Sequence, residues 1–599
     1  MHKATKNLNE KDIQYKKSLK KITKFLKNNF FSITTLLALI TFVIDPFKSW
    51  GFDYIDADGY MHAIRIKNWL INPSFFEQPI LESNYPFGEI LHITRPFDII
   101  WILCTLPFIN ILSLKEAIFI GGGITAPILG IFTALALGYG LKRNFNIFIA
   151  LLGIFLFLNN PHAQTIYNFI IADHHPLITT LGVLSISIIM CWFKKRQNYY
   201  LIRLSLVLSI MSLCVVDGIL FSFLIILFFI YLYVVKNVSI TYAYKIIKYY
   251  TIFSIILLLL NPPYHGYFHV DTGRLSILHI TTFILSSIAL YIIEHYHIHT
   301  KRLKITSLFL AFSSICLIII LIFGKQALIS PINDELKAIF INRIFQNYSI
   351  TKTQLHHIFI SSLIPFTSIL LNIFMLLRKQ SQHNRLLILN LFIGLPLFLL
   401  NFYAIRFEYF NLLYTIIPFL CLIDDIYKKS NFHRQNKGRF PLSIYILILG
   451  YLILQITSSF PLLLQEMPPK TDYLNENLLK NIEKTKGTIL TDIFLSPIYV
   501  YKCDVNTVST PYYSNTEGII DGHKILYSTN DFDIISLLLK HQITQIVLFE
   551  NYDKSYYNMN EQNKHKLYYR ILKDERLPPY LEKIPSNNEN IHHYKVLSL

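Results

Sequence analysis

Charged residues are scarce in this chain of 599 residues. Asp, Glu, Lys and Arg together make up 15% of it, whereas soluble domains carry about 25%. Hydrophobic residues make up 53%, and the mean hydropathy is +0.42. So little charge excludes an ordinary water-soluble protein, because much of the surface must face something other than water.

Cysteine and tryptophan are scarce as well. The six cysteines lie mostly inside apolar runs, and their spacing is not typical of a disulfide framework or a metal knuckle. The four tryptophans all lie in the N-terminal third, at Trp50, Trp69, Trp101 and Trp192. Neither residue type therefore indicates a disulfide-stabilised fold or a structural zinc site.

Long apolar runs rich in Ile, Leu and Phe are abundant. A helix needs about 20 apolar residues to cross a hydrocarbon core. The sequence predicts about thirteen spans, at residues 29–45, 117–140, 146–160, 175–193, 202–217, 218–235, 248–262, 276–293, 305–323, 356–377, 386–401, 408–424 and 441–460. We therefore expect a multi-pass α-helical membrane protein.

The net charge of +18 comes from 55 Lys and Arg against 37 Asp and Glu. These basic residues gather in short segments between apolar runs, which is the pattern of cytoplasmic loops rather than of a nucleic-acid-binding surface. Nine lysines lie between Lys3 and Lys27. We expect no nucleic acid partner, a plasma (bacterial inner) membrane location and a cytoplasmic N-terminus.

The predicted domains are a basic tail (1–28), a transmembrane domain (29–464) and a periplasmic α/β domain (465–599). Within the second, a first outer loop (46–116) holds interfacial helices, one of them at 97–112. In the last domain, residues 488–490, 499–500 and 543–549 are expected to form strands. Residues 534–540 and 563–572 are expected to form helices.

Acidic residues and histidines collect in two outer loops. The first loop contains Asp56 and Asp58, and the second contains Asp173-His174-His175. Carboxylates and imidazoles from two loops would suit a divalent cation, Mg²⁺ or Mn²⁺, held by Asp58, Asp173 and His175 with Asp56 and His174 as further ligands. The alternative is that Asp56 and Asp173 only cap the helices that follow them.

Arg406 stands near the outer ends of two predicted spans. An arginine at that depth is costly unless it is paired or faces a polar cavity. Its planar guanidinium suits a phosphate. A salt bridge to Glu408 is the structural alternative.

These residues carry a resemblance to a known family. Asp58-Gly59-Tyr60 resembles the first acidic motif of the oligosaccharyltransferase catalytic subunit and its bacterial single-subunit relatives. Asp173-His174-His175 stands where that family has its second acidic motif. The segment around Arg406-Phe407 is similar to the family's lipid-pyrophosphate-binding segment. The wider fold that the resemblance implies is the membrane glycosyltransferase class GT-C.

A second likeness is to a group of bacterial GT-C-like membrane proteins. It rests on His92-Ile-Thr-Arg95 and on Pro511-Tyr512-Tyr-Ser-Asn515. His92, Arg95 and Tyr60 would then bind phosphate or sugar, and Tyr512 and Asn515 would contribute to the acceptor site.

The resemblance implies an inverting transfer of a sugar or oligosaccharide from a polyprenyl-phosphate or pyrophosphate lipid to a protein or envelope-glycan acceptor. Asp58, Asp173 and Arg406 would be the catalytic residues. Membrane lipids would be further partners of the chain. The family's Trp-Trp-Asp acceptor motif is missing, since residues 487–494 read Gly-Thr-Ile-Leu-Thr-Asp-Ile-Phe. The alternatives are a flippase or transporter for a lipid-linked glycan, and a non-catalytic GT-C-like subunit.

Overall fold

The structure is a computed structural model. It describes residues 20–47, 57–91, 93–236, 238–327, 334–340, 355–378, 381–429, 442–457, 470–550, 561–573, 576–586 and 588–597, together with residues 18, 53, 54 and 332.

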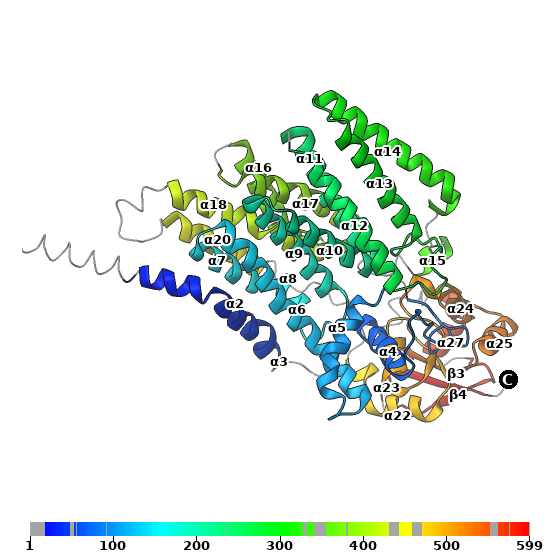
Figure 1. The fold of residues 1–599 in the computed structure, drawn as a ribbon. Coiled ribbons are helices and arrows are strands. Elements are labelled where there is room, and N and C mark those ends of the chain that lie inside the picture. The colour runs from blue at the N-terminus through cyan, green and yellow to red at the C-terminus, as the bar shows by residue number, and fades with distance from the viewer. Residues whose placement is uncertain are drawn as a thin grey trace, which may run out of the picture.

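Long helices packed side by side make up most of the chain (Figure 1). The helices in the predicted spans are α2 (Phe30–Leu39, continued by η1, Ile40–Ile44), α6 (Leu114–Asn144), α7 (Ile147–Leu158), α9 (His175–Lys195), α10 (Asn198–Cys214), α11 (Val216–Lys236), α12 (Thr241–Leu260), α13 (Ile277–His295), α14 (Lys301–Phe323), α16 (Leu355–Leu377), α17 (Asn384–Tyr403), α18 (Ile416–Lys429) and α20 (Leu442–Thr457). Every predicted span therefore contains a helix.

Eight helices among the described residues are long and apolar enough to cross a membrane, and a bent pair formed by residues 20–28 and 30–44 brings the number to nine. Shorter apolar helical segments lie at Pro96–Phe108, Ile147–Leu158, Asn198–Cys214, Ser362–Leu377 and Leu442–Leu454. The multi-pass helical class is confirmed, and the number of crossings stays a prediction.

Shorter elements lie between the long helices. They are α3 (Asp45–Phe47), α4 (Ala57–Ile71), α5 (Pro96–Thr105), η2 (Leu106–Phe108), α8 (Pro161–Ile166), η3 (Gly324–Ala327), α15 (Asp334–Ile339) and η7 (Ile405–Leu413). The run expected to form one interfacial helix at 97–112 forms α5 and η2.

Helix α6 illustrates how the bundle closes. Ser113 accepts a hydrogen bond from the Glu116 backbone N–H, and the Glu116 side chain accepts from the Ser113 N–H, so a capping box starts the helix. Glycines then allow close packing. A Cβ on Gly122 would collide with the Trp101 ring of α5, and one on Gly140 would touch Ser187 of α9.

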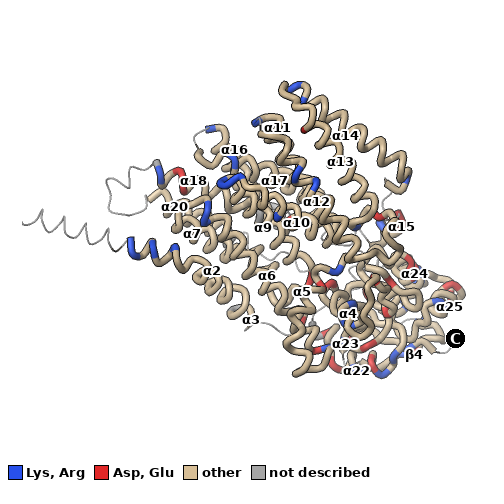
Figure 2. The backbone as a smooth tube through the Cα atoms, viewed as in Figure 1, with Lys and Arg blue, Asp and Glu red and all other residues tan. Residues whose placement is uncertain are grey.

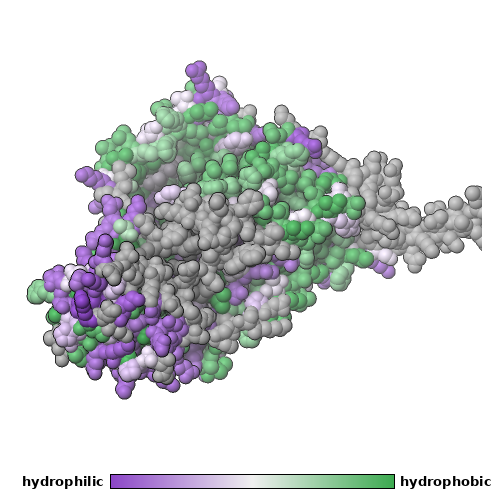
Figure 3. All heavy atoms as spheres, turned by 180° about the vertical axis from the view of Figure 1, so that it is seen from behind, coloured by the Kyte–Doolittle hydropathy of each residue, from purple (hydrophilic) through white to green (hydrophobic). Residues whose placement is uncertain are grey.

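The two ends of the bundle differ in charge. Lys and Arg mark the helix ends far from the C-terminal domain, whereas Asp and Glu gather around α4, α5 and that domain (Figure 2). Seen from behind, hydrophobic residues cover the helices and hydrophilic residues cover the end that carries the domain (Figure 3). This separation is what the positive-inside rule describes. The sidedness itself stays a prediction.

The C-terminal domain is a five-stranded sheet with the strand order β2-β1-β3-β5-β4. Strand β1 pairs in parallel with β2 and β3, and β5 pairs antiparallel with β3 and β4. The strands are β1 (Thr488–Leu490), β2 (Asn506–Thr507), β3 (Ile543–Phe549), β4 (Leu581–Ile584) and β5 (Ile591–Val596). The helices are α21 (Lys470–Tyr473), α22 (Glu476–Thr485), α23 (Ser496–Cys503), η8 (Tyr513–Asn515), α24 (Thr516–Tyr527), α25 (Asp531–Lys540), η9 (Glu561–Asn563) and α27 (Leu567–Leu572).

One element prediction in this domain is wrong. Residues 499–500 were expected to form a strand and lie instead in helix α23. Nearly every residue of α23 is buried, so no polar face shows the helical period in the sequence. Strands 488–490 and 543–549 and the helix at 534–540 are confirmed. Of the helix expected at 563–572, only Leu567–Leu572 forms an α-helix.

The C-terminal domain is fixed to the first outer loop. The Thr507 N–H donates to the Glu82 carbonyl at 2.8 Å, and the Tyr85 N–H donates to the Thr507 carbonyl at 3.1 Å. These bonds lie at the edge strand β2. Lys67 and Lys115 both pair with Asp504, at 2.6 and 3.1 Å. The domain thus has a fixed position beside helix α4.

Candidate functional site

Asp58 lies in the first turn of helix α4. Its carboxylate accepts a hydrogen bond from the Tyr512 hydroxyl of the C-terminal domain at 2.5 Å. The two residues are 454 positions apart in sequence, and the docking described above brings them together. The first sequence motif therefore meets the segment 511–515 predicted to contribute to the acceptor site.

Asp173 precedes helix α9 and is bound on both oxygens by His175. Its Oδ1 accepts from the His175 backbone N–H at 2.8 Å, and its Oδ2 lies 2.9 Å from the His175 Nδ1. Asp173 thus accepts a hydrogen bond from the backbone N–H of the first residue of α9, while the N-cap position is His174, whose side chain makes no capping hydrogen bond. Asp173 also lies beside the first motif.

Asp58 and Asp173 act on each other electrostatically. Burial, followed by the neighbouring charge of Asp173, raises the pKa of Asp58 above its ordinary value, although the Tyr512 hydroxyl opposes the shift. Burial also favours protonation of Asp173, but the charge and hydrogen bonds of His175 outweigh it and hold the pKa of Asp173 below its usual range. Two carboxyl groups with opposite shifts can take different roles at one pH.

The third predicted segment lies against the same helix end. Arg406 is in the 3-10 helix η7, and the ring centroids of Tyr409 in η7 and His175 are 3.9 Å apart. The Thr179 hydroxyl of α9 also donates to the Tyr409 carbonyl at 3.5 Å. The backbone that carries Arg406 therefore lies beside α9, while the Arg406 side chain is outside the part that the structure describes.

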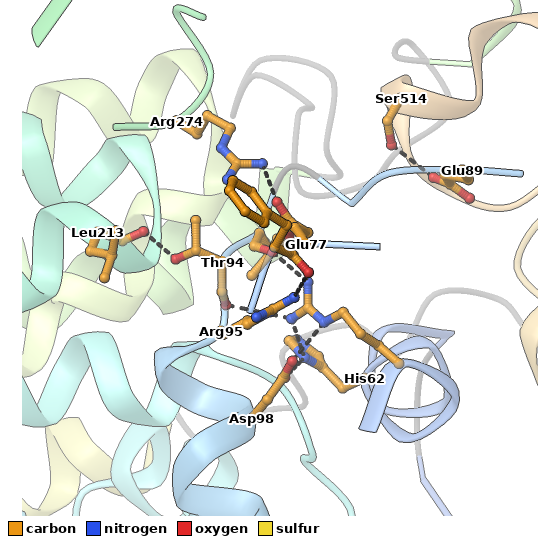
Figure 4. A network of polar contacts seen from close by, with 12 residues as sticks. His62, Glu77, Glu89, Thr94, Arg95, Asp98, Leu213, Arg274 and Ser514 are labelled. Atoms are coloured by element: carbon orange, nitrogen blue, oxygen red, sulfur yellow. Dashed lines mark hydrogen bonds and ion pairs between the residues drawn. The ribbon is translucent and has the colours of Figure 1, made fainter. Parts of the chain in front are cut away.

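A buried ionic network that the sequence did not predict adjoins the two acids. His62 Nδ1 lies 2.6 Å from Asp98 Oδ1, and Arg65 Nε donates to Asp98 Oδ2 at 2.6 Å (Figure 4). Arg65 also lies 3.9 Å from Glu77, which accepts from Arg274 at 2.7 Å. The charge of His62 lowers the pKa of both Asp58 and Asp173.

A sequence signal for this network existed but was weak. Ionisable side chains are rare in a chain so poor in charge, and Asp98 stands two residues after Pro96 in the run Arg95-Pro96-Phe97-Asp98. The positions 62, 65, 77, 98 and 274 share no spacing, because the network joins separate segments.

Three further predicted residues have other neighbours. Arg95 donates to the backbone carbonyls of residues 74–76 at 2.7 to 3.2 Å and lies over the Trp69 ring. Tyr60 donates its hydroxyl to Asp53. Asn515 is buried and donates to Ser83, Val508 and Thr510. Each of these contacts holds a loop in place, and His92 and Asp56 lie outside the described residues.

Asp58, Asp173 and His175, which were expected to hold Mg²⁺ or Mn²⁺, already have hydrogen-bond partners within the protein. Among the described residues, no group of three or more His, Cys, Asp or Glu side chains is arranged to hold a metal ion. Both oxygens of Asp173 already accept from His175, and Asp58 accepts from Tyr512. The described donors therefore do not complete a site for Mg²⁺ or Mn²⁺.

Comparisons with known proteins identify the fold. No protein-family model matches the sequence, and the search of curated proteins found no match. Among solved structures, the oligosaccharyltransferase AglB from Archaeoglobus fulgidus in complex with an inhibitory peptide and a dolichol-phosphate matches with a TM-score of 0.69. The identity is 13%, over 89% of this chain and 70% of that chain.

Two other structures of the Archaeoglobus fulgidus enzyme also match. One is tethered to an acceptor peptide containing the NVT sequon (TM-score 0.66, 13% identity, 91% of this chain and 71% of that chain). The other is in complex with Zn and sulfate (TM-score 0.63, 14% identity, 88% and 68%). At this identity the likeness concerns the fold. The chain has the GT-C membrane glycosyltransferase fold that the sequence motifs predicted.

Proposed function

We propose that this chain transfers a sugar or oligosaccharide from a polyprenyl-phosphate or pyrophosphate lipid to an acceptor at the membrane face that carries the C-terminal domain. The observation that carries the proposal is the pair Asp58 and Asp173, held beside α9 and η7 with opposite pKa shifts. The relative AglB has been solved with a dolichol-phosphate and an inhibitory peptide, which supports a lipid-linked donor.

The proposed reaction assigns one task to each group. Asp58 accepts the proton of an acceptor hydroxyl or amide, because its raised pKa suits a base working near neutral pH. The freed oxygen or nitrogen attacks the anomeric carbon as the bond to the lipid phosphate breaks on the opposite side, which inverts the anomeric centre. Asp173 stays ionised and stabilises positive charge that develops on the sugar.

Arg406 receives the departing phosphate in this proposal. The backbone of η7 lies against α9 beside Asp173 and His175, and a guanidinium there would neutralise charge on the leaving oxygen. The Mg²⁺ or Mn²⁺ expected from the sequence needs donors beyond those described, so no step is assigned to a metal.

A complementation experiment tests the function. A strain lacking the chain receives the wild type, Asp58→Asn or the matched control Asp533→Asn on the exposed face of helix α25. Its surface glycans and its lipid-linked saccharides are then analysed by mass spectrometry. We expect Asp58→Asn to reduce transfer by about 100-fold or more, with the lipid-linked donor accumulating.

Three outcomes are decisive. Wild-type glycans in the Asp58→Asn strain would contradict the proposed base. Donor accumulating on the cytoplasmic leaflet, with no transfer reaction detected in membranes, would favour the flippase. Unchanged glycans in the deletion strain would favour a non-catalytic subunit.

A further inference from the structure

A cavity of about 340 Å³ lies beside the candidate site. Its wall combines the first outer loop, the loop between α12 and α13, and the segment 513–514 of the C-terminal domain. Ligand pockets span about 300–1,000 Å³, so the cavity has room for a small ligand. Tyr513 and Ser514, inside the 511–515 motif, line it, whereas Tyr512 and Asn515 do not.

The lining combines polar and aromatic side chains with apolar ones such as Ile90, Leu91 and Leu275. Tyr264, His265 and His269 come from the α12–α13 loop together with Asp271 and Arg274. The rings of His265 and His269 lie 4.8 Å apart. Hydroxyl-rich rings are recognised by aromatic faces against their C–H groups and by charged side chains against their hydroxyls.

One wall of the cavity is continuous with the Asp58 environment. Tyr513 and Ser514 line the cavity and directly follow Tyr512, which donates to Asp58. Ser514 donates to Glu89 at 2.7 Å (Figure 4), and Glu89 also lines the cavity. A ligand in the cavity would therefore contact Tyr513, the residue that directly follows the one bonded to Asp58.

A second wall connects to the buried ionic network. Arg274 lines the cavity and donates to Glu77, which lies 3.9 Å from Arg65, and Arg65 donates to Asp98 beside His62 (Figure 4). Arg274 therefore joins the cavity wall to the network beside the two acids.

We propose that this cavity, formed by the loops around Glu89 and Asp271 and by Tyr513-Ser514, is a saccharide-binding subsite. The proposal rests on the proposed glycosyl transfer, since it assigns a place to one sugar unit of the substrate next to Asp58. A sugar of the lipid-linked donor and a sugar of the acceptor have the same chemistry, so the experiment distinguishes them.

The test measures sugar binding without requiring transfer. Saturation-transfer difference NMR records the binding of a panel of methyl glycosides of glucose, galactose, mannose and N-acetylglucosamine to the full chain in detergent. We expect at least one glycoside to bind the wild type. Its signal should fall at least fivefold in Asp271→Asn and in His265→Ala, and persist in Asp58→Asn and in the control His299→Ala on the loop after α13.

The outcomes separate the subsite from the enzyme activity. Absence of any glycoside signal with the wild type, or an unchanged signal in both cavity variants, overturns the subsite. Displacement of the signal by a polyprenyl-phosphate form of the bound sugar assigns the cavity to the donor, and persistence assigns it to the acceptor. Glycoside binding in a chain without transfer activity would sink the proposed function and keep the subsite.

Discussion

The Tyr512 hydroxyl acts directly on the protonation of Asp58. Burial and Asp173 raise the pKa of Asp58, and the hydrogen bond from Tyr512 lowers it. Tyr512→Phe removes only the lowering contribution, so the pKa of Asp58 should rise further. Because Asp58 must be ionised to accept a proton, the acid limb of kcat/KM against pH should move to higher pH, with the loss largest in acid.

A matched tyrosine controls for the loss of a hydroxyl. Tyr499 donates to the Tyr473 carbonyl within the C-terminal domain at 3.2 Å, and Tyr499→Phe should leave the acid limb in place. An acid limb that stays at the wild-type pH in Tyr512→Phe would show that Asp58 is not the group that titrates.

Asp98 anchors the ionic network beside the two acids. It is fully buried and binds both Arg65 and His62. Removing one partner of a buried ion pair costs about 3–5 kcal/mol, because the remaining charge loses its counterion. We expect Asp98→Asn to lower the free energy of unfolding by that amount, measured as reduced thermal stability of the detergent-solubilised chain.

Asp504 provides the comparison for Asp98. It pairs with Lys67 and Lys115, but its side chain is 58% exposed. Exposed pairs contribute about 0–1 kcal/mol, so Asp504→Asn should leave the melting temperature nearly unchanged. Equal losses in the two variants would contradict a structural role specific to the buried network.

At the scale of elements, helices α6 and α5 pack closely at Gly122. A Cβ at Gly122 would overlap the Trp101 ring and the Tyr54 hydroxyl. Overpacking of this kind costs about 1–3 kcal/mol, and here it would also displace α5, which carries Asp98. We expect Gly122→Ala to reduce both the melting temperature and transfer activity.

Gly450 of α20 is the matched control, since a Cβ there would meet nothing within 4 Å. Gly450→Ala should therefore behave as wild type or melt slightly higher, because alanine favours a helix. A Gly122→Ala chain with wild-type stability and activity would show that α5 and α6 can separate without affecting the site.

The sequence predicted a helix's position wherever the pattern of apolar and polar residues within that segment was enough to define it. Apolar runs bounded by polar residues predicted the positions of the long helices, and a helix, α4, follows Asp56 as expected. Helix α23 was missed because it is buried on all sides. Strand β4 was missed because its exposed residues leave a weak apolar pattern in Leu581–Ile584. Strand β5 was missed because two of its buried residues, His592 and His593, are polar.

The candidate site likewise contains residues that the sequence suggested and contacts that it did not. Asp58 and Asp173 could be selected as candidates because acids are rare and both belong to motifs that resemble those of the oligosaccharyltransferase family. The His62–Asp98 and Glu77–Arg274 contacts were not, since 36 and 197 positions separate the partners. Pairings over such separations depend on how loops from different helices meet, and a single sequence does not encode that as a local pattern.

At the scale of the whole molecule, the C-terminal domain completes the candidate site only while it stays fixed to the first outer loop. His541 connects the two, because its Nδ1 lies 2.8 Å from the Tyr85 carbonyl and its Nε2 lies 2.9 Å from Asp521. Lys540 also donates to Asp521 at 2.6 Å. Asp521 thus orients the imidazole that joins domain to loop.

The pH dependence of this connection follows from the pKa of Asp521. Burial favours its protonation, but the hydrogen bonds from His541 and Lys540 outweigh that effect and lower the pKa of Asp521. A carboxyl group whose pKa is lowered by folding stabilises the fold above its unfolded pKa, about 3.9. That contribution is lost as the pH falls through the lower, folded value.

Asp521→Asn should therefore destabilise the C-terminal domain at neutral pH by about 1.5–3 kcal/mol, the usual contribution of hydrogen bonds to a charged group. Hydrogen exchange of the full chain, measured at several pH values, should show faster exchange around β3 and residues 82–85. The difference in exchange rate between the variant and the wild type should be complete at pH 7 and should shrink below about pH 4.

Asp533→Asn on the exposed face of α25 is the control and should leave exchange unchanged. Because Tyr512 reaches Asp58 from this domain, transfer activity should fall with the loss of protection, and activity retained by a detached domain would contradict its part in the site.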